Sequence, residues 1–311
     1  MKCLATLFVA LMASAMVSAQ EVTFSSIQRG KSAIQTGQWM GQTGQWMGRD
    51  VWAPDRITNV TNPRYPGTSE VYRFVVKPGD KVGGWSGERA EFSGIRTAKG
   101  VLLEDDCSGT QYYALSVYIP SGWKAPEVDA SAQVAWGTFL QLHGPLGFLN
   151  SPPVSIDLID HYTLSVRGGN ADLLGDWHGK IYELKDGGAI RFDQWEDFVL
   201  MIKFARDDKG EVRLWRRTKG VLTNVFELAG AATLVFKPSL EAKAPNPTQR
   251  RLAGAHYWKQ GFYRSTSPNV TTTLYQTGLV RASTFDAAAI AAFGHRERSL
   301  ESEGRSQKTA R

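Results

Sequence analysis

The chain has 311 residues, 42% of them apolar, and a formal net charge of +6, so it can fill a sizeable core and attracts polyanions. Its 36 lysines and arginines are scattered along the chain, which argues against a nucleic-acid-binding protein. No segment approaches the roughly 20 consecutive apolar residues that a membrane-spanning helix needs.

The N-terminus has the features of a secretory signal peptide over residues 1–19. Lys2 supplies a positive charge, Leu4 to Val17 is mostly apolar, and small residues precede Gln20. Removal of this segment would lower the formal charge from +6 to +5 and leave Cys107 as the single cysteine. We therefore expect a secreted protein (periplasmic in a Gram-negative host) that has no intramolecular disulfide and no membrane anchor.

The first repeated element is a heptad that occurs twice in succession, at residues 35–41 and 42–48. One duplication is too short for a solenoid, which needs several units. We interpret it as an insertion that lengthens an N-terminal loop or strand.

Further along the chain, short runs of apolar and β-branched residues alternate with glycine, proline and aspartate turns. These runs predict strands at Val71–Val76, Tyr112–Ile119, Ala135–His143, Ser155–Ile159, Tyr162–Arg167 and Asp197–Phe204. The turn at residues 207–210 leads into a further strand over residues 211–216. Many short strands without long amphipathic helices predict an all-β, antiparallel β-sandwich of jelly-roll (concanavalin-like) type over residues 20–284. Residues 285–311 are predicted to form a disordered or weakly helical tail.

Three short motifs combine charged, amide and aromatic side chains with a period of two. They are Arg89-Ala90-Glu91, Gln141-Leu142-His143 and the segment from Tyr257 to Tyr263. In an extended strand, alternate side chains project from one face of the sheet. We therefore expect Arg89 and Glu91 to share a face, as would Gln141 and His143, and Tyr257, Lys259, Gly261 and Tyr263.

These residue types suit cleavage of a uronic-acid polymer by β-elimination. The proton next to the sugar carboxylate becomes removable once the carboxylate charge is neutralised, and Arg89 and Gln141 have the donors for that. His143 can act as a base or as a further neutralising group, because the pKa of histidine lies near the working pH. Tyr263 can protonate the departing oxygen, and in a syn elimination it could also remove the first proton. Lys259 would hold a neighbouring acidic sugar.

The three motifs, in this order, resemble those of jelly-roll polysaccharide lyases. Alginate lyases carry R-x-E, Q-I-H and Y-F-K-x-G-x-Y, and the surrounding chain is similar to the glucuronan lyases and heparinase-I-like enzymes. The resemblance covers about residues 70 to 282 and implies the catalytic residues Arg89, Gln141, His143 and Tyr263. It implies substrate contacts for Glu91, Tyr257 and Lys259. The first motif departs from the R-x-E-x-R of many alginate lyases, because its fifth position is Ser93.

Several of these residues also have structural interpretations. Arg89 and Glu91 could form an ordinary ion pair in which Glu91 orients Arg89. Gln141 and His143 could be satisfied interior residues, and Tyr257 fits a core position as well as a sugar contact.

Two other functional classes remain to be compared with a lyase. A glycoside hydrolase could use acidic residues from Glu127 to Asp129, but Ser131 stands where a third carboxylate would be needed, so we reject it. A non-catalytic, lectin-like module for acidic glycans is the stronger alternative. We expect a monomer whose partner is an acidic polysaccharide. We also expect no catalytic metal, because no metal-ligand cluster is evident, and the resemblance leaves a structural calcium open.

Overall fold

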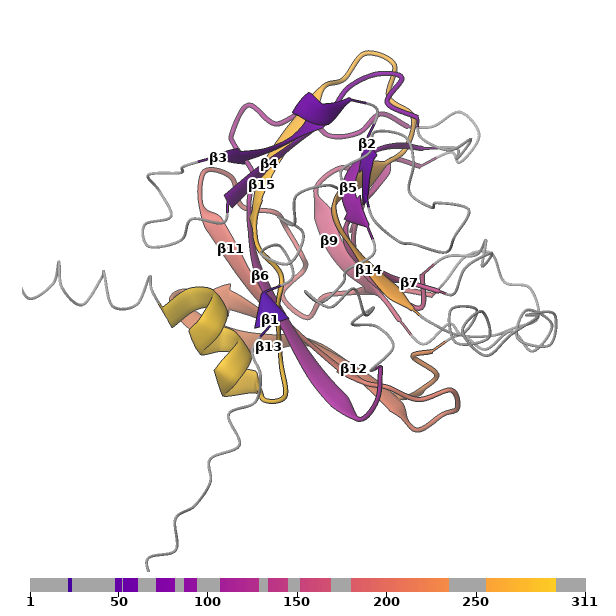
Figure 1. Ribbon diagram of the computed structural model, residues 1–311, viewed down its shortest axis with the longest axis vertical. Helices are drawn as coiled ribbons and strands as arrows, with labels where there is room; N and C mark the ends of the chain where they lie inside the picture. The colour runs from indigo at the N-terminus through magenta and orange to yellow at the C-terminus, as the bar shows by residue number, and fades with distance from the viewer. Residues whose placement is uncertain are drawn as a thin grey trace, which may run out of the picture.

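The computed structural model describes residues 22–23, 48–51, 53–60, 71–81, 87–93, 107–128, 134–144, 152–168, 180–234 and 256–294. Its strands form two antiparallel sheets that face each other, so the predicted β-sandwich of jelly-roll type is confirmed (Figure 1). The signal segment, most of the duplicated heptad and residues 295–311 lie outside the described residues, and the statements about them stay predictions.

The nine-stranded sheet has the order β13-β12-β11-β6-β15-β4-β3, with β16 beside β6 and β1 beside β16. Its strands are β1 (Val22–Thr23), β3 (Ile57–Val60), β4 (Val71–Val76), β6 (Thr110–Tyr118), β11 (Trp195–Lys203), β12 (Gly210–Thr218), β13 (Val221–Ala231), β15 (Thr272–Thr277) and β16 (Val280–Ala282). A short 3-10 helix, η1 (Pro54–Arg56), precedes β3.

The seven-stranded sheet has the order β10-β9-β8-β7-β14-β5-β2. Its strands are β2 (Gly48–Val51), β5 (Glu88–Ser93), β7 (Trp136–His143), β8 (Val154–Ile159), β9 (Thr163–Arg167), β10 (Ile181–Glu183) and β14 (Tyr257–Arg264). Each strand predicted from the sequence is present, with ends that differ by a few residues.

The main core lies between the two sheets and is filled from alternate positions of the strands. Trp258 and Phe262 of β14 are buried there, and the ring of Trp258 lies 4.5 Å from that of Tyr113 on β6. On β14 the sequence directs the large apolar residues Trp258 and Phe262 toward the core, and burying such faces is the main driving force for the sandwich. The other face of the same strand is therefore left for polar side chains.

A helix over residues 285–294 packs against the outer face of the nine-stranded sheet (Figure 1). Thr284 precedes the helix, and its side-chain oxygen accepts a hydrogen bond from the backbone nitrogen of Ala287, which is N-terminal capping. Phe293 is 1% exposed and lies with Val199 and Val280 in a second, smaller apolar cluster. In the part of the chain that is described, no helix is long and apolar enough to span a membrane.

Candidate functional site

The three sequence motifs lie on three adjacent strands of the seven-stranded sheet, with β14 between β5 and β7. Tyr263 is paired with Arg89 on β5, and Tyr257 is paired with His143 on β7. Lys259 is paired with Gln141 on β7 and with Ser93 on β5. Strand pairing therefore gathers residues that are far apart in the sequence into one cluster.

The motif side chains lie on the face of this sheet that is turned away from the core. The residues between them belong to the core cluster, as Ala90, Leu142 and Trp258 show. The seven candidates on this polar face, called the motif cluster below, are Arg89, Glu91, Gln141, His143, Tyr257, Lys259 and Tyr263.

The carboxylate of Glu91 lies at the centre of the motif cluster. The amide nitrogen of Gln141 donates a 2.7 Å hydrogen bond to Glu91 Oε1. Arg89 Nη1 lies 3.6 Å from Glu91 Oε2, and Lys259 Nζ lies 3.9 Å from the same oxygen. Donors from three strands thus converge on a single carboxylate, an arrangement that can also bind the carboxylate of a ligand.

The ionic groups of the motif cluster are almost completely buried. Arg89 and Lys259 are each 3% exposed, Glu91 is 1% exposed and Gln141 is 4% exposed. Burying several charges is costly unless they are paired, so such groups more often mark a site than a source of stability. His143 and Tyr263 are only partly buried, so the two groups suited to proton transfer form the accessible edge of the cluster.

Tyr263 is in contact with the arginine of the first motif. The guanidinium carbon of Arg89 lies 3.7 Å from the centre of the Tyr263 ring, which is cation–π stacking. Arg89 therefore touches both the proposed proton donor and the central carboxylate. A single side chain connects the charge-neutralising part of the cluster to its proton-transfer part.

His143 is held by its neighbours in one orientation. Its ring stacks on that of Tyr257 with centres 4.7 Å apart, and its Nδ1 lies 3.0 Å from the carbonyl oxygen of Gly144. In the neutral ring, a proton on Nδ1 would satisfy that carbonyl and leave Nε2 free to accept a proton. Burial, reinforced by the charge of Lys259, lowers the pKa of His143 from 6.5 to about 3, so the imidazole is neutral at neutral pH. This corrects the expectation from the sequence that the pKa of His143 lies near the working pH, and it makes His143 a weaker base than an ordinary histidine.

The lowered pKa of His143 predicts a specific effect of acid on stability. Because the unfolded chain binds the proton at a pKa of 6.5 and the folded chain only near 3, the free energy of unfolding falls as pH drops through this window. The slope is at most about 1.4 kcal/mol per pH unit. His143→Gln should remove this contribution, which urea unfolding of both proteins between neutral pH and pH ~4.5 would measure. Equal pH dependence of the two proteins would contradict the prediction.

Gly261 differs from the sequence expectation that it shares the polar face with Lys259 and Tyr263. The pairing of β14 with β7 shifts between Gln260 and Tyr263, which marks a β-bulge. Gly261 has φ +145°, and a Cβ there would lie 2.3 Å from the carbonyl oxygen of Ala90 and 2.9 Å from the Phe74 ring. The position is thus directed at the core and at β5, because the bulge interrupts the period of two.

We predict that Gly261→Ala destabilises the protein by about 1–3 kcal/mol, since a Cβ would collide with the carbonyl oxygen of Ala90 and the backbone conformation is one that L residues rarely adopt. Thermal unfolding of the variant would measure this loss. Gly79→Ala is the matched control, because Gly79 also has a positive φ but nothing lies within 4 Å of its missing Cβ. If the two substitutions lower the stability by the same amount, close packing at Gly261 does not contribute to it.

The polar face continues onto β8 and β9, which the sequence analysis did not include in the site. Asp157 accepts a 2.8 Å hydrogen bond from Thr138 Oγ1 and a 3.0 Å hydrogen bond from Arg167 Nε. Ser155, paired with Gln141, and Ser165, paired with Asp157, are fully buried. The sequence could have indicated this extension of the polar face, since Ser155 and Asp157 alternate with buried Ile156 and Leu158 in a predicted strand.

Residues set aside in the sequence analysis have structural surroundings. Cys107 is partly buried and packs against the main core. The carboxylate of Glu127 accepts hydrogen bonds from the backbone and side-chain nitrogens of Asn269, so it is held in a loop contact.

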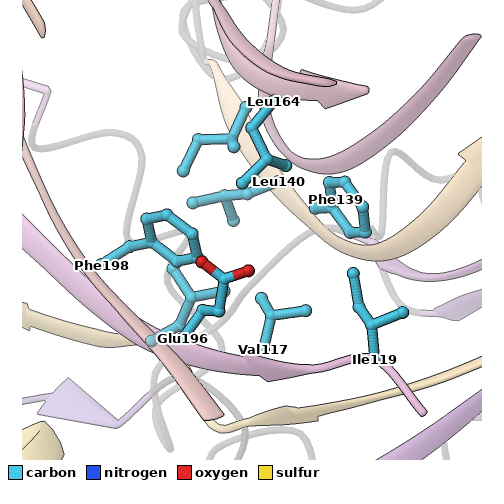
Figure 2. A pocket seen from close by; sticks show the side chains of 9 residues that line it. Val117, Ile119, Phe139, Leu140, Leu164, Glu196 and Phe198 are labelled. Atoms are coloured by element: carbon cyan, nitrogen blue, oxygen red, sulfur yellow. The ribbon is translucent and has the colours of Figure 1, made fainter. Parts of the chain in front are cut away.

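A small cavity in the described part of the chain lies between the two sheets and is separate from the polar face (Figure 2). Its lining is apolar apart from Glu196, and includes Val117, Phe139 and Phe198. The Glu196 carboxylate is engaged by Arg216, whose Nε lies 2.6 Å away, and by Arg191. This cavity is therefore a packing gap in the core, and it offers no set of proton-transfer groups.

A comparison with models of known protein families matches most of the chain. The family model described as polysaccharide lyase matches residues 35–277, which include all three motifs. The chain belongs to the polysaccharide lyase family. A search of curated proteins found no match. As a member of this family, the protein is a carbon–oxygen lyase that acts on polysaccharides.

Solved structures of carbohydrate-active enzymes are similar to this polysaccharide lyase at low sequence identity. An endo-β-1,4-glucuronan lyase from the fungus Trichoderma reesei has 14% identity and a TM-score of 0.49, covering 76% of this chain and 90% of its own. A family PL-14 alginate lyase from Aplysia kurodai has 11% identity and a TM-score of 0.45, and the match covers 75% of this chain and 89% of the alginate lyase. The catalytic domain of a glycoside hydrolase family 131 protein from Coprinopsis cinerea has 16% identity and a TM-score of 0.45, and the match covers 85% of this chain and 90% of that domain.

Proposed function

We propose that this polysaccharide lyase is a secreted enzyme that cleaves a uronic-acid-containing polysaccharide by β-elimination. The observation that carries the proposal is the convergence of Arg89, Gln141 and Lys259 on one carboxylate, beside the partly exposed His143 and Tyr263. A neutral-sugar polymer would give these buried cationic and amide donors no charge to bind.

In the proposed reaction, Arg89 and Gln141 bind the carboxylate of the sugar whose carbon 5 loses a proton. Neutralising this carboxylate stabilises the enolate-like intermediate, where negative charge develops. Since both donors already point at Glu91, a substrate carboxylate would share them with it, and Glu91 keeps them oriented between turnovers. Lys259, next to Gln141, would bind the charge of the adjoining sugar.

Proton transfer is assigned to the two accessible groups. The carbon 5 proton passes to a base, which is Tyr263 as phenolate or neutral His143 through Nε2. The electron pair then forms the double bond between carbons 4 and 5, and the bond from carbon 4 to the glycosidic oxygen breaks. The departing oxygen takes a proton from the Tyr263 hydroxyl. These steps use side chains alone, and we propose no catalytic metal.

The test is incubation of the purified protein with polyglucuronate, alginate, a heparin-type glycan and a neutral glucan. Elimination creates an unsaturated uronate end that absorbs ultraviolet light, so we expect absorbance to rise with at least one polyuronate and never with the neutral glucan. Binding to polyuronates without any rise would contradict the proposal and favour a lectin-like module. New reducing ends without ultraviolet absorbance would indicate hydrolysis instead.

A further inference from the structure

The Tyr263 ring is enclosed on three sides by described residues. The Arg89 guanidinium lies over its face at 3.7 Å. The Trp136 ring meets it edge to face, with centres 4.7 Å apart and planes at 81°. On a third side lies Gly87, where a Cβ would be 2.4 Å from Tyr263 Cε2 and 3.0 Å from Trp136 Cη2.

Trp136 is itself fixed to the strand that carries Tyr263. Its carbonyl oxygen accepts a 3.0 Å hydrogen bond from the backbone nitrogen of Ser265, which directly follows the last residue of β14. Gly87 directly precedes β5, where its neighbour Glu88 is paired with Arg264. Arg89 and Trp136 therefore belong to the two strands that flank β14, and Gly87 directly precedes one of them.

A tyrosine that transfers a proton must hold its hydroxyl within hydrogen-bond distance of the reacting atom. A displacement of about 1 Å can cost about 10²-fold in rate. Arg89 alone contacts one face of the ring and leaves rotation in the other direction open. Trp136 supplies a second ring contact, and the missing side chain of Gly87 leaves room for both rings and for the backbone carbonyl oxygen of Arg264, which a Cβ would approach to 2.5 Å.

We propose that Trp136 and Gly87 are positioning residues for Tyr263, acting through contact with its ring and not on the substrate charge. The inference rests on the proposed function, because it takes the Tyr263 hydroxyl as the proton-transfer group. It extends the first two motifs at the sequence level: Gly87 lies two positions before Arg89, and Trp136 lies five positions before Gln141.

A double-mutant cycle between Trp136 and Tyr263 tests the inference. With the best polyuronate, Trp136→Ala should lower kcat by about 10–100-fold and change KM much less, since only the placement of the hydroxyl is lost. Trp136→Phe, which keeps an aromatic ring at the site, should recover most of kcat. In the Tyr263→Phe background, Trp136→Ala should cause no further loss, because no hydroxyl remains to be placed.

Two results would overturn the inference while leaving the proposed function intact. One is an equal loss of kcat from Trp136→Ala in both backgrounds, and the other is a rise in KM alone, as expected of a sugar-binding platform. If Tyr263→Phe itself keeps wild-type turnover, the assignment of Tyr263 fails and the inference fails with it.

Matched controls separate positioning from general loss of packing. Trp215→Ala removes a partly buried tryptophan from the outer face of the nine-stranded sheet, where it packs 5.0 Å from Phe285, and should leave kcat unchanged. If Trp136→Ala does not fold, Trp136→Leu takes its place in the cycle. Gly87→Ala is an independent second test. It should lower kcat by the same factor as Trp136→Ala, and it should cause no further loss of kcat in the Tyr263→Phe background.

Discussion

Tyr263→Phe is expected to lower kcat on the best polyuronate by about 10²–10⁴-fold, the usual cost of losing a general acid or base. The substitution removes only the hydroxyl, so the ring keeps its contacts with Arg89 and Trp136. Substrate affinity should change little, because the carboxylate is bound by other residues. Initial rates of ultraviolet absorbance, with affinity measured separately by calorimetry, would provide both quantities.

Tyr275→Phe is the control for this experiment. Tyr275 is a partly buried tyrosine on β15, in the other sheet, and its ring lies 5.9 Å from that of Tyr118. It should retain wild-type turnover. Wild-type turnover by folded Tyr263→Phe would refute the assignment of this residue as the proton donor.

Arg89→Lys is expected to lower kcat by about 10²–10³-fold, comparable to the loss of one donor in an oxyanion site. Lysine keeps the positive charge near Glu91, which limits damage to the buried ionic cluster. It loses the planar guanidinium that stacks on Tyr263 and can bind a carboxylate with two hydrogen bonds. Removing the charge altogether would leave the buried Glu91 with Lys259 as its remaining close cation, and the resulting loss of stability would confuse folding with catalysis.

The comparison for Arg89→Lys is Arg213→Lys on β12. Arg213 pairs with Glu211 and Glu227 with its side chain 38% exposed, so exchanging it for lysine should affect neither turnover nor stability appreciably. If Arg89→Lys retains full turnover, charge alone is sufficient at this position and the bidentate, stacked geometry is not required.

The sequence by itself determined which side chains could share a face. The period of two in β5, β7 and β14 separates Arg89, Gln141 and Lys259 from buried neighbours such as Ala90, Leu142 and Trp258. This separation is a local property, because successive side chains of any strand point to opposite faces, and one face had to be apolar to form the core. The antiparallel sandwich followed from the same alternation and from the density of turn residues.

Only the tertiary structure decided how these faces meet. Nothing local to β14 specifies that it pairs with both β5 and β7. Gly261 on β14 and its partner Glu91 on β5 are 170 positions apart in the sequence. The central position of Glu91 and the enclosure of Tyr263 by Trp136 and Gly87 depend on that pairing. The bulge that turns Gly261 toward the core breaks the local period on which the sequence argument relied. Strand order and register are set by packing the whole sheet against its partner, so they appear only when distant segments come together.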